Sequence, residues 1–125
     1  MIDPFVQANL STSSYDVTLG NFYFREVKPE HGVSIYNPYS KTSVDVTWNA
    51  RQVQCAESAG DWMQRTGTTL DGISSRDKII WIGPGETILG HTNEFIGGRT
   101  TVTTMMKARS SIGRNFIEVC KCAGK

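Results

Sequence analysis

A chain of 125 residues, of which 38% are hydrophobic and 10% aromatic, has room for one globular domain and is too apolar to be intrinsically disordered. Its 13 basic and 12 acidic residues leave a net charge of +1, which argues against a protein that binds nucleic acid through many phosphate contacts. No apolar run approaches the roughly 20 residues of a membrane-spanning helix, and the N-terminus lacks the order of a secretory signal. The odd number of cysteines, three, does not indicate a disulfide framework. We therefore expect a cytoplasmic protein with no nucleic-acid and no membrane partner.

The first half of the chain predicts two strands and one short helix. Apolar residues alternate at period two over 14–24 and again over 44–48, and this alternation predicts a strand in each segment. Between them, residues 29–41 contain glycine, asparagine and proline and are predicted to form a loop or hairpin. Residues 52–65 could form a short helix, although Gly60 interrupts it and the apolar spacing is poor.

The second half of the chain predicts further short strands. Residues 78–82 form a β-favouring run that ends at the Gly-Pro-Gly turn of 83–85, and 87–89 resume a strand. Residues 100–106 are rich in β-favouring types, and 116–122 alternate again. Many short strands, frequent turns and almost no helical periodicity together predict an all-β sandwich or barrel in a single domain.

One polar segment has the composition of a phosphate-binding site. Two arginines, two serines, a lysine and a glycine stand between two apolar runs at 107–115. Hydroxyl and backbone N–H groups can donate hydrogen bonds to phosphate oxygens, and arginine adds charge and paired donors. The alternative is an ordinary polar turn with solvated arginines, which the composition alone favours because short motifs often arise by chance.

Three segments resemble, in the same order, the motifs of the dCTP deaminase and trimeric dUTPase superfamily. The first is Ser-Ser-Tyr-Asp-Val-Thr-Leu-Gly at 13–20, and the next is the Pro-Gly-Glu, apolar strand and Thr-x-Glu of 84–96. The Arg-Ser-Ser of 109–111, followed by Arg114, resembles the deaminase form of the second motif, where typical dUTPases have Arg-Ser-Gly. The resemblance extends over most of the chain and favours the dCTP deaminase branch.

The resemblance implies a fold, an assembly and a reaction. Members of the superfamily fold as a distorted, jelly-roll-like β-barrel with little helix, and they assemble as homotrimers with active sites at subunit contacts. The implied reaction is the hydrolytic deamination of dCTP to dUTP and ammonia, with Mg²⁺ bound through the triphosphate. The alternatives within the enzyme class are a dUTPase and a bifunctional dCTP deaminase/dUTPase that makes dUMP from dCTP.

The resemblance also implies which residues form the site. Arg109, Ser110 and Ser111 match positions that contact the nucleotide and its phosphates. Ala123 matches a position beside the pyrimidine, where backbone groups contact the base edge. Ser110 and Arg114 match the polar groups that organise the catalytic water, and they are therefore the candidate catalytic residues.

The sequence predicts no metal site held by the protein itself. Zinc deaminases need His-x-Glu and Pro-Cys-x-x-Cys, but His91 and Glu94 are spaced differently and the second motif does not occur. We therefore expect no zinc. His91 is expected to pack or hydrogen-bond, Asp16 of the first motif to support the site, and all three cysteines to pack as buried small residues.

The match to the superfamily stops near the end of the chain. In relatives, a Gly-rich turn, an aromatic residue and a strand with the catalytic glutamate follow the position of Ala123, and 124–125 contain none of these. Glu118 does not match the position of that glutamate. We therefore expect an incomplete domain over 1–125 with little or no deaminase activity, since loss of a general base costs about a hundred- to ten-thousand-fold in rate. The alternative from another class is a non-catalytic trimeric module with a nucleotide-binding or structural role.

Overall fold

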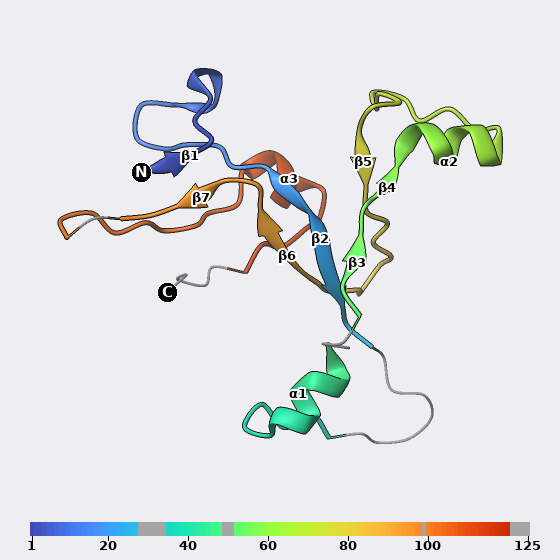
Figure 1. The fold of residues 1–125 in the computed structure, drawn as a ribbon, viewed down its shortest axis with the longest axis horizontal. Helices are drawn as coiled ribbons and strands as arrows, with labels where there is room; N and C mark the ends of the chain where they lie inside the picture. The colour runs from blue at the N-terminus through green and yellow to red at the C-terminus, as the bar shows by residue number, and fades with distance from the viewer. Residues whose placement is uncertain (28–34, 49–51, 99, 121–125) are drawn as a thin grey trace. The chain divides into compact units, whose positions relative to one another are not determined.

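The computed structural model describes residues 1–27, 35–48, 52–98 and 100–120 (Figure 1). The chain divides into two compact units, each of which is described by itself. One unit is Val17–Asn93, and the other joins Met1–Asp16 to Glu94–Lys125. The prediction of a single domain over 1–125 stays a prediction.

A three-stranded antiparallel sheet is the largest sheet of the unit Val17–Asn93. Strand β2 (Leu19–Arg25) lies between β3 (Gln54–Cys55) and β6 (Ile88–Thr92). The pairing of β2 with β6 shifts register once, between Leu19 and Tyr23. These strands confirm the β segments predicted around 14–24 and 87–89, with ends displaced by several residues.

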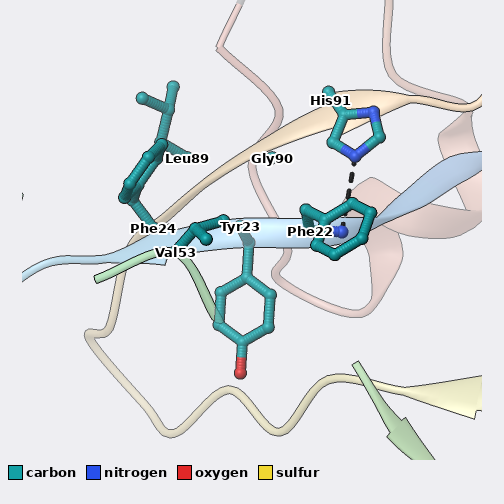
Figure 2. Close-up of a pocket in the computed structure, with 7 residues that line it drawn as sticks. All are labelled: Phe22, Tyr23, Phe24, Val53, Leu89, Gly90 and His91. Atoms are coloured by element: carbon teal, nitrogen blue, oxygen red, sulfur yellow. Dashed lines mark hydrogen bonds between the residues drawn. The ribbon is translucent and has the colours of Figure 1, made fainter. Parts of the chain in front are cut away.

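Tyr23 is the buried aromatic residue of β2. The period-two alternation over 14–24 predicts that Phe22 and Phe24 share one face of the strand, but Phe22 is exposed and Tyr23 is buried. Figure 2 shows Tyr23 pointing away from His91, on the opposite side of β2. Side chains alternate along a strand, so the choice of face depends on which neighbours cover it.

Helix α2 (Ala59–Thr66) has well-defined ends. It follows β4 (Glu57–Ser58), which pairs antiparallel with β5 (Lys78–Ile79). The Ser58 hydroxyl accepts a hydrogen bond from the backbone N–H of Asp61 at 3.3 Å, which caps the helix N-terminus. Gly67 ends the helix at φ +68°, a left-handed conformation that glycine adopts without steric cost. The short helix predicted within 52–65 is therefore confirmed for its second half.

The prediction of a strand over 44–48 is wrong, because these residues lie at the end of helix α1 (Lys41–Thr47) and just beyond it. The hydroxyl of Ser40 caps the helix by accepting a hydrogen bond from the backbone of the first turn. Lys41 and Asp45 form an ion pair one turn apart, which also favours the helix. The helix buries none of its residues, so the period-two alternation did not mark a face of the core.

In the second unit, β1 (Ile2–Asp3) pairs antiparallel with β7 (Phe95–Ile96). A 3₁₀ helix, η1 (Gln7–Asn9), lies near the N-terminus, and helix α3 (Ser110–Arg114) lies within the polar segment. The structure has no strand over 100–120, so the strands predicted there are wrong within the described residues. Val102 and Met105 are exposed, and β propensity without a paired, half-buried surface does not make a strand.

The all-β class is confirmed within the described residues. Every strand pairing in the described part of the chain is antiparallel, and the few helices there are short. The strands described form three separate small sheets, so the closed barrel stays a prediction. The longest helix in the described segments has eight residues, too few to cross a membrane.

The Glu86 carboxylate links the Pro-Gly-Glu turn to β2 through an ion pair and a hydrogen bond. Glu86 Oε2 accepts hydrogen bonds from Arg25 Nη1 at 2.6 Å and from the backbone N–H of Gly83 at 2.8 Å. Arg25 Nη2 also donates to the carbonyl oxygen of Trp81 at 2.6 Å. The guanidinium carbon of Arg25 lies 5.6 Å from the centroid of the Tyr23 ring. The glutamate of this motif is therefore a structural residue that positions the turn before β6.

Glu86→Gln should lower the free energy of unfolding by about 1 kcal/mol. The substitution removes the carboxylate that pairs with Arg25, and the Arg25 side chain is only 26% exposed. The matched control is Asp45→Asn, which removes the more exposed pair of α1 and should cost less than about 0.5 kcal/mol. Urea unfolding followed by tryptophan fluorescence measures both variants. Equal losses in the two variants would contradict the anchoring role of Glu86.

Candidate functional site

The Arg-Ser-Ser segment predicted to contact phosphate lies on helix α3 rather than in a loop. Arg109 occupies the N-cap position in extended conformation, with φ −70° and ψ 147°. Its carbonyl oxygen accepts hydrogen bonds from two N–H groups of the helix at 3.0 and 3.2 Å. The side chains of Ser110, Ser111 and Arg114 are exposed, so all four polar groups of the motif are open to solvent.

Arg109 forms an ion pair with Asp16, which belongs to the first motif of the sequence. Arg109 Nη1 lies 3.4 Å from Asp16 Oδ2, and the two side chains are 68% and 43% exposed. The backbone N–H of Asp16 donates to the carbonyl oxygen of Asn9 at 2.9 Å, which fixes the position of the aspartate. The structure therefore brings together two motifs that are more than ninety positions apart in the sequence.

The C-terminal end of α3 is a Schellman motif with phenylalanine at the position where glycine is usual. The N–H of Phe116 donates to the carbonyl oxygen of Gly113 at 3.0 Å, and that of Ile117 to Ile112 at 3.4 Å. Phe116 has φ +58°, in the left-handed region, and its side chain is 98% exposed. The alternation over 116–122 predicts that Phe116 is a strand residue, and no glycine at 115 or 116 indicates the end of a helix.

A hollow of about 430 Å³ lies beside α3. It is lined by Ala108, Gly113, Phe116, Ile117, Glu118 and Val119. Two of these residues belong to or adjoin the Arg-Ser-Ser segment, and the other four follow the helix directly. The hollow and the predicted phosphate-binding side chains therefore share one short stretch of the chain.

His91 packs and hydrogen-bonds on the sheet of β2 and β6, as predicted (Figure 2). Its Nε2 accepts a hydrogen bond from the backbone N–H of Phe22 at 3.3 Å, and its Nδ1 lies 2.8 Å from the carbonyl oxygen of Thr92. The imidazole and the Phe22 ring are stacked with centroids 6.2 Å apart. Gly20 leaves room for this ring, since a Cβ there would lie 2.1 Å from His91 Cε1. The glycine of the first motif therefore has a packing role.

The remaining predictions concern Ala123, the three cysteines and a metal site. Ala123, predicted to lie beside the pyrimidine, falls outside the described residues. Cys55 and Cys120 are exposed, so the prediction that they are buried is wrong, and Cys122 lies outside the described residues. Within the described ranges, no three His, Cys, Asp or Glu side chains are grouped so that they could hold a metal ion, and the expectation of no zinc stays a prediction.

Phe116→Gly should have a free energy of unfolding about 1 kcal/mol higher than Phe116→Ala, because only glycine accepts φ +58° without cost. The same pair of substitutions at Tyr39, which is 97% exposed and has no positive φ, is the control. There the glycine variant should be no more stable than the alanine variant. Urea unfolding of the four variants makes the comparison, and equal stability of the two Phe116 variants would contradict the left-handed turn.

The Arg109–Asp16 pair should be coupled by about 0.5 kcal/mol or less, since exposed ion pairs are screened by water and salt. A double-mutant cycle with Arg109→Gln and Asp16→Asn measures the coupling in urea unfolding. The coupling should decrease further when the salt concentration rises to about 1 M. A large coupling that salt leaves unchanged would show that the pair is shielded from solvent.

Comparison with known protein families gives a match over the full length of this chain. A family model described as dCTP deaminase-like matches residues 1–125. No curated protein and no solved structure matches the chain. The match includes the first motif, the Pro-Gly-Glu turn and the Arg-Ser-Ser helix whose geometry is described above. The chain therefore belongs to the dCTP deaminase-like family, whose members act in nucleotide metabolism.

Proposed function

We propose that this chain binds dCTP and that it is a protein of the dCTP deaminase type, whose active form catalyses the hydrolytic deamination of dCTP to dUTP and ammonia. The observation that carries the proposal is the segment 109–114 in a member of the dCTP deaminase-like family. Arg-Ser-Ser followed by a second arginine is the deaminase form of this motif. The helix α3 holds these side chains in the open, where a small anionic ligand can reach them.

The triphosphate is held by Arg109, Ser110 and Ser111. Arginine offers paired N–H donors and a permanent charge, and the serine hydroxyls donate single hydrogen bonds to phosphate oxygens. The nucleotide enters with Mg²⁺ already bound to its phosphates, so the ion is part of the substrate. Asp16 pairs with Arg109 only weakly, because both side chains are largely exposed, and a triphosphate can replace it as the partner of the guanidinium.

The reaction adds water to C4 of the cytosine ring and expels the exocyclic amine as ammonia, leaving a carbonyl group. Ser110 and Arg114 position the water and stabilise the charge that develops at the tetrahedral carbon. Ala123 lies beside the pyrimidine in this proposal, with its backbone groups at the base edge.

The active form is proposed to be a homotrimer. Support comes from exposed large apolar side chains in the unit that carries α3, where Phe95 is 80% and Met105 74% exposed. Association between copies of the chain would remove these apolar side chains from water. Light scattering on the purified chain should therefore give the mass of three 13.8 kDa subunits.

The test is to incubate the purified chain with dCTP and Mg²⁺ and to measure ammonia and nucleotide products. Equal amounts of dUTP and ammonia would support the deaminase. Release of dUMP and pyrophosphate together with ammonia would indicate the bifunctional enzyme. Hydrolysis of dUTP without any action on dCTP would indicate a dUTPase. Binding of dCTP without turnover would favour the non-catalytic module, and absence of both binding and turnover would overturn the proposal.

Arg109→Gln and Arg114→Gln should each weaken dCTP binding or turnover by roughly ten- to a hundredfold, the effect of losing one charged hydrogen-bonding group. Arg65→Gln is the matched control, because Arg65 is similarly exposed, at 62%, and lies on α2 outside the motif. It should leave the binding of dCTP unchanged. The proposal fails if all three variants bind dCTP equally well.

A further inference from the structure

Phe116 occupies a position that stability alone does not explain. Its backbone is in the left-handed conformation, which costs a phenylalanine more than a glycine or an asparagine. Its ring is 98% exposed, so packing within the described structure does not offset that cost. Backbone strain held at one residue is typical of sites where the side chain has a task outside the fold.

The ring of Phe116 stands at the hollow beside α3. The hollow has a volume of about 430 Å³, within the range of small-molecule sites. Ile117 and Val119 supply further apolar lining, and Glu118 supplies a carboxylate. Two other lining residues, Ala108 and Gly113, adjoin Arg109 and Arg114 respectively. A ligand that fills the hollow and also contacts the two arginines needs a flat apolar ring next to an anionic group. A nucleotide has both.

We infer that this hollow holds the pyrimidine base, stacked on the ring of Phe116, with Glu118 accepting a hydrogen bond from the exocyclic amine of cytosine. The inference rests on the proposed function, and it adds Phe116 and Glu118 to Ala123 as residues that contact the base. Aromatic side chains stack on bases of any kind, so Phe116 contributes affinity. A carboxylate accepts from the N4 amine of cytosine, whereas uracil has a carbonyl at that position, so Glu118 contributes selectivity.

The test compares dissociation constants for dCTP, dUTP and inorganic tripolyphosphate, measured by calorimetry on the full chain. Phe116→Gly should weaken dCTP and dUTP alike by roughly 5- to 150-fold, the effect of one base–aromatic stack. The same variant should bind tripolyphosphate as the unmodified chain does, because it removes only the ring. Glu118→Gln should weaken dCTP more than dUTP. Tyr39→Gly, which removes an equally exposed aromatic ring elsewhere, should change none of the three constants.

Phe116→Gly is not expected to unfold the chain, since glycine suits the left-handed turn better than phenylalanine. If the unmodified chain binds dCTP and Phe116→Gly binds it equally well, the base pocket is wrong while the proposed function stands. If Phe116→Gly keeps its nucleotide affinity but lowers the molar mass in light scattering, Phe116 serves contact between copies and the inference is overturned. If the unmodified chain binds neither dCTP nor tripolyphosphate, the proposed function itself fails.

Discussion

The contacts of Glu86 determine how β2 and the turn before β6 fit together. Its carboxylate accepts from Arg25, 61 positions earlier in the sequence, and from the backbone of its own turn. Arg25 adds a hydrogen bond to the Trp81 carbonyl and lies over the ring of Tyr23. Among the described residues, the buried apolar side chains are Tyr23, Ala56 and Ala59. With so small an apolar core, partly shielded charged hydrogen bonds contribute a large share of what fixes the strand pairing.

The candidate site depends on one short helix and the residues next to it. The N-cap residue of α3 pairs with Asp16, the helix carries the remaining polar groups of the motif, and the turn after it presents Phe116. Phosphate recognition and base recognition would then come from adjacent parts of the same segment. Such an arrangement fixes the distance between the two contacts through the backbone, which favours ligands that carry a ring and a phosphate chain together.

The alternation of apolar residues and the turn-forming residues predicted several strands and one turn correctly. The strands around β2 and β6 and the Gly-Pro-Gly turn follow from alternation and turn residues, and the packing role of His91 was also expected. Helix α1 was predicted as a strand because its valines alternate, whereas the serine cap and the Lys41–Asp45 pair favour a helix. The cysteines were expected to be buried from residue type alone, but type does not decide exposure in a small core.

By itself the sequence determined the all-β class, the order of the motifs and the residue types available for phosphate contact, because these depend on periodicity and on side-chain chemistry. The tertiary structure decided that Tyr23 rather than Phe22 is buried, that Glu86 forms an ion pair with Arg25, and that Asp16 forms one with Arg109. It also decided that Phe116 stands exposed in a left-handed turn. These outcomes depend on contacts between residues far apart in the chain and on backbone conformations that no local pattern specifies.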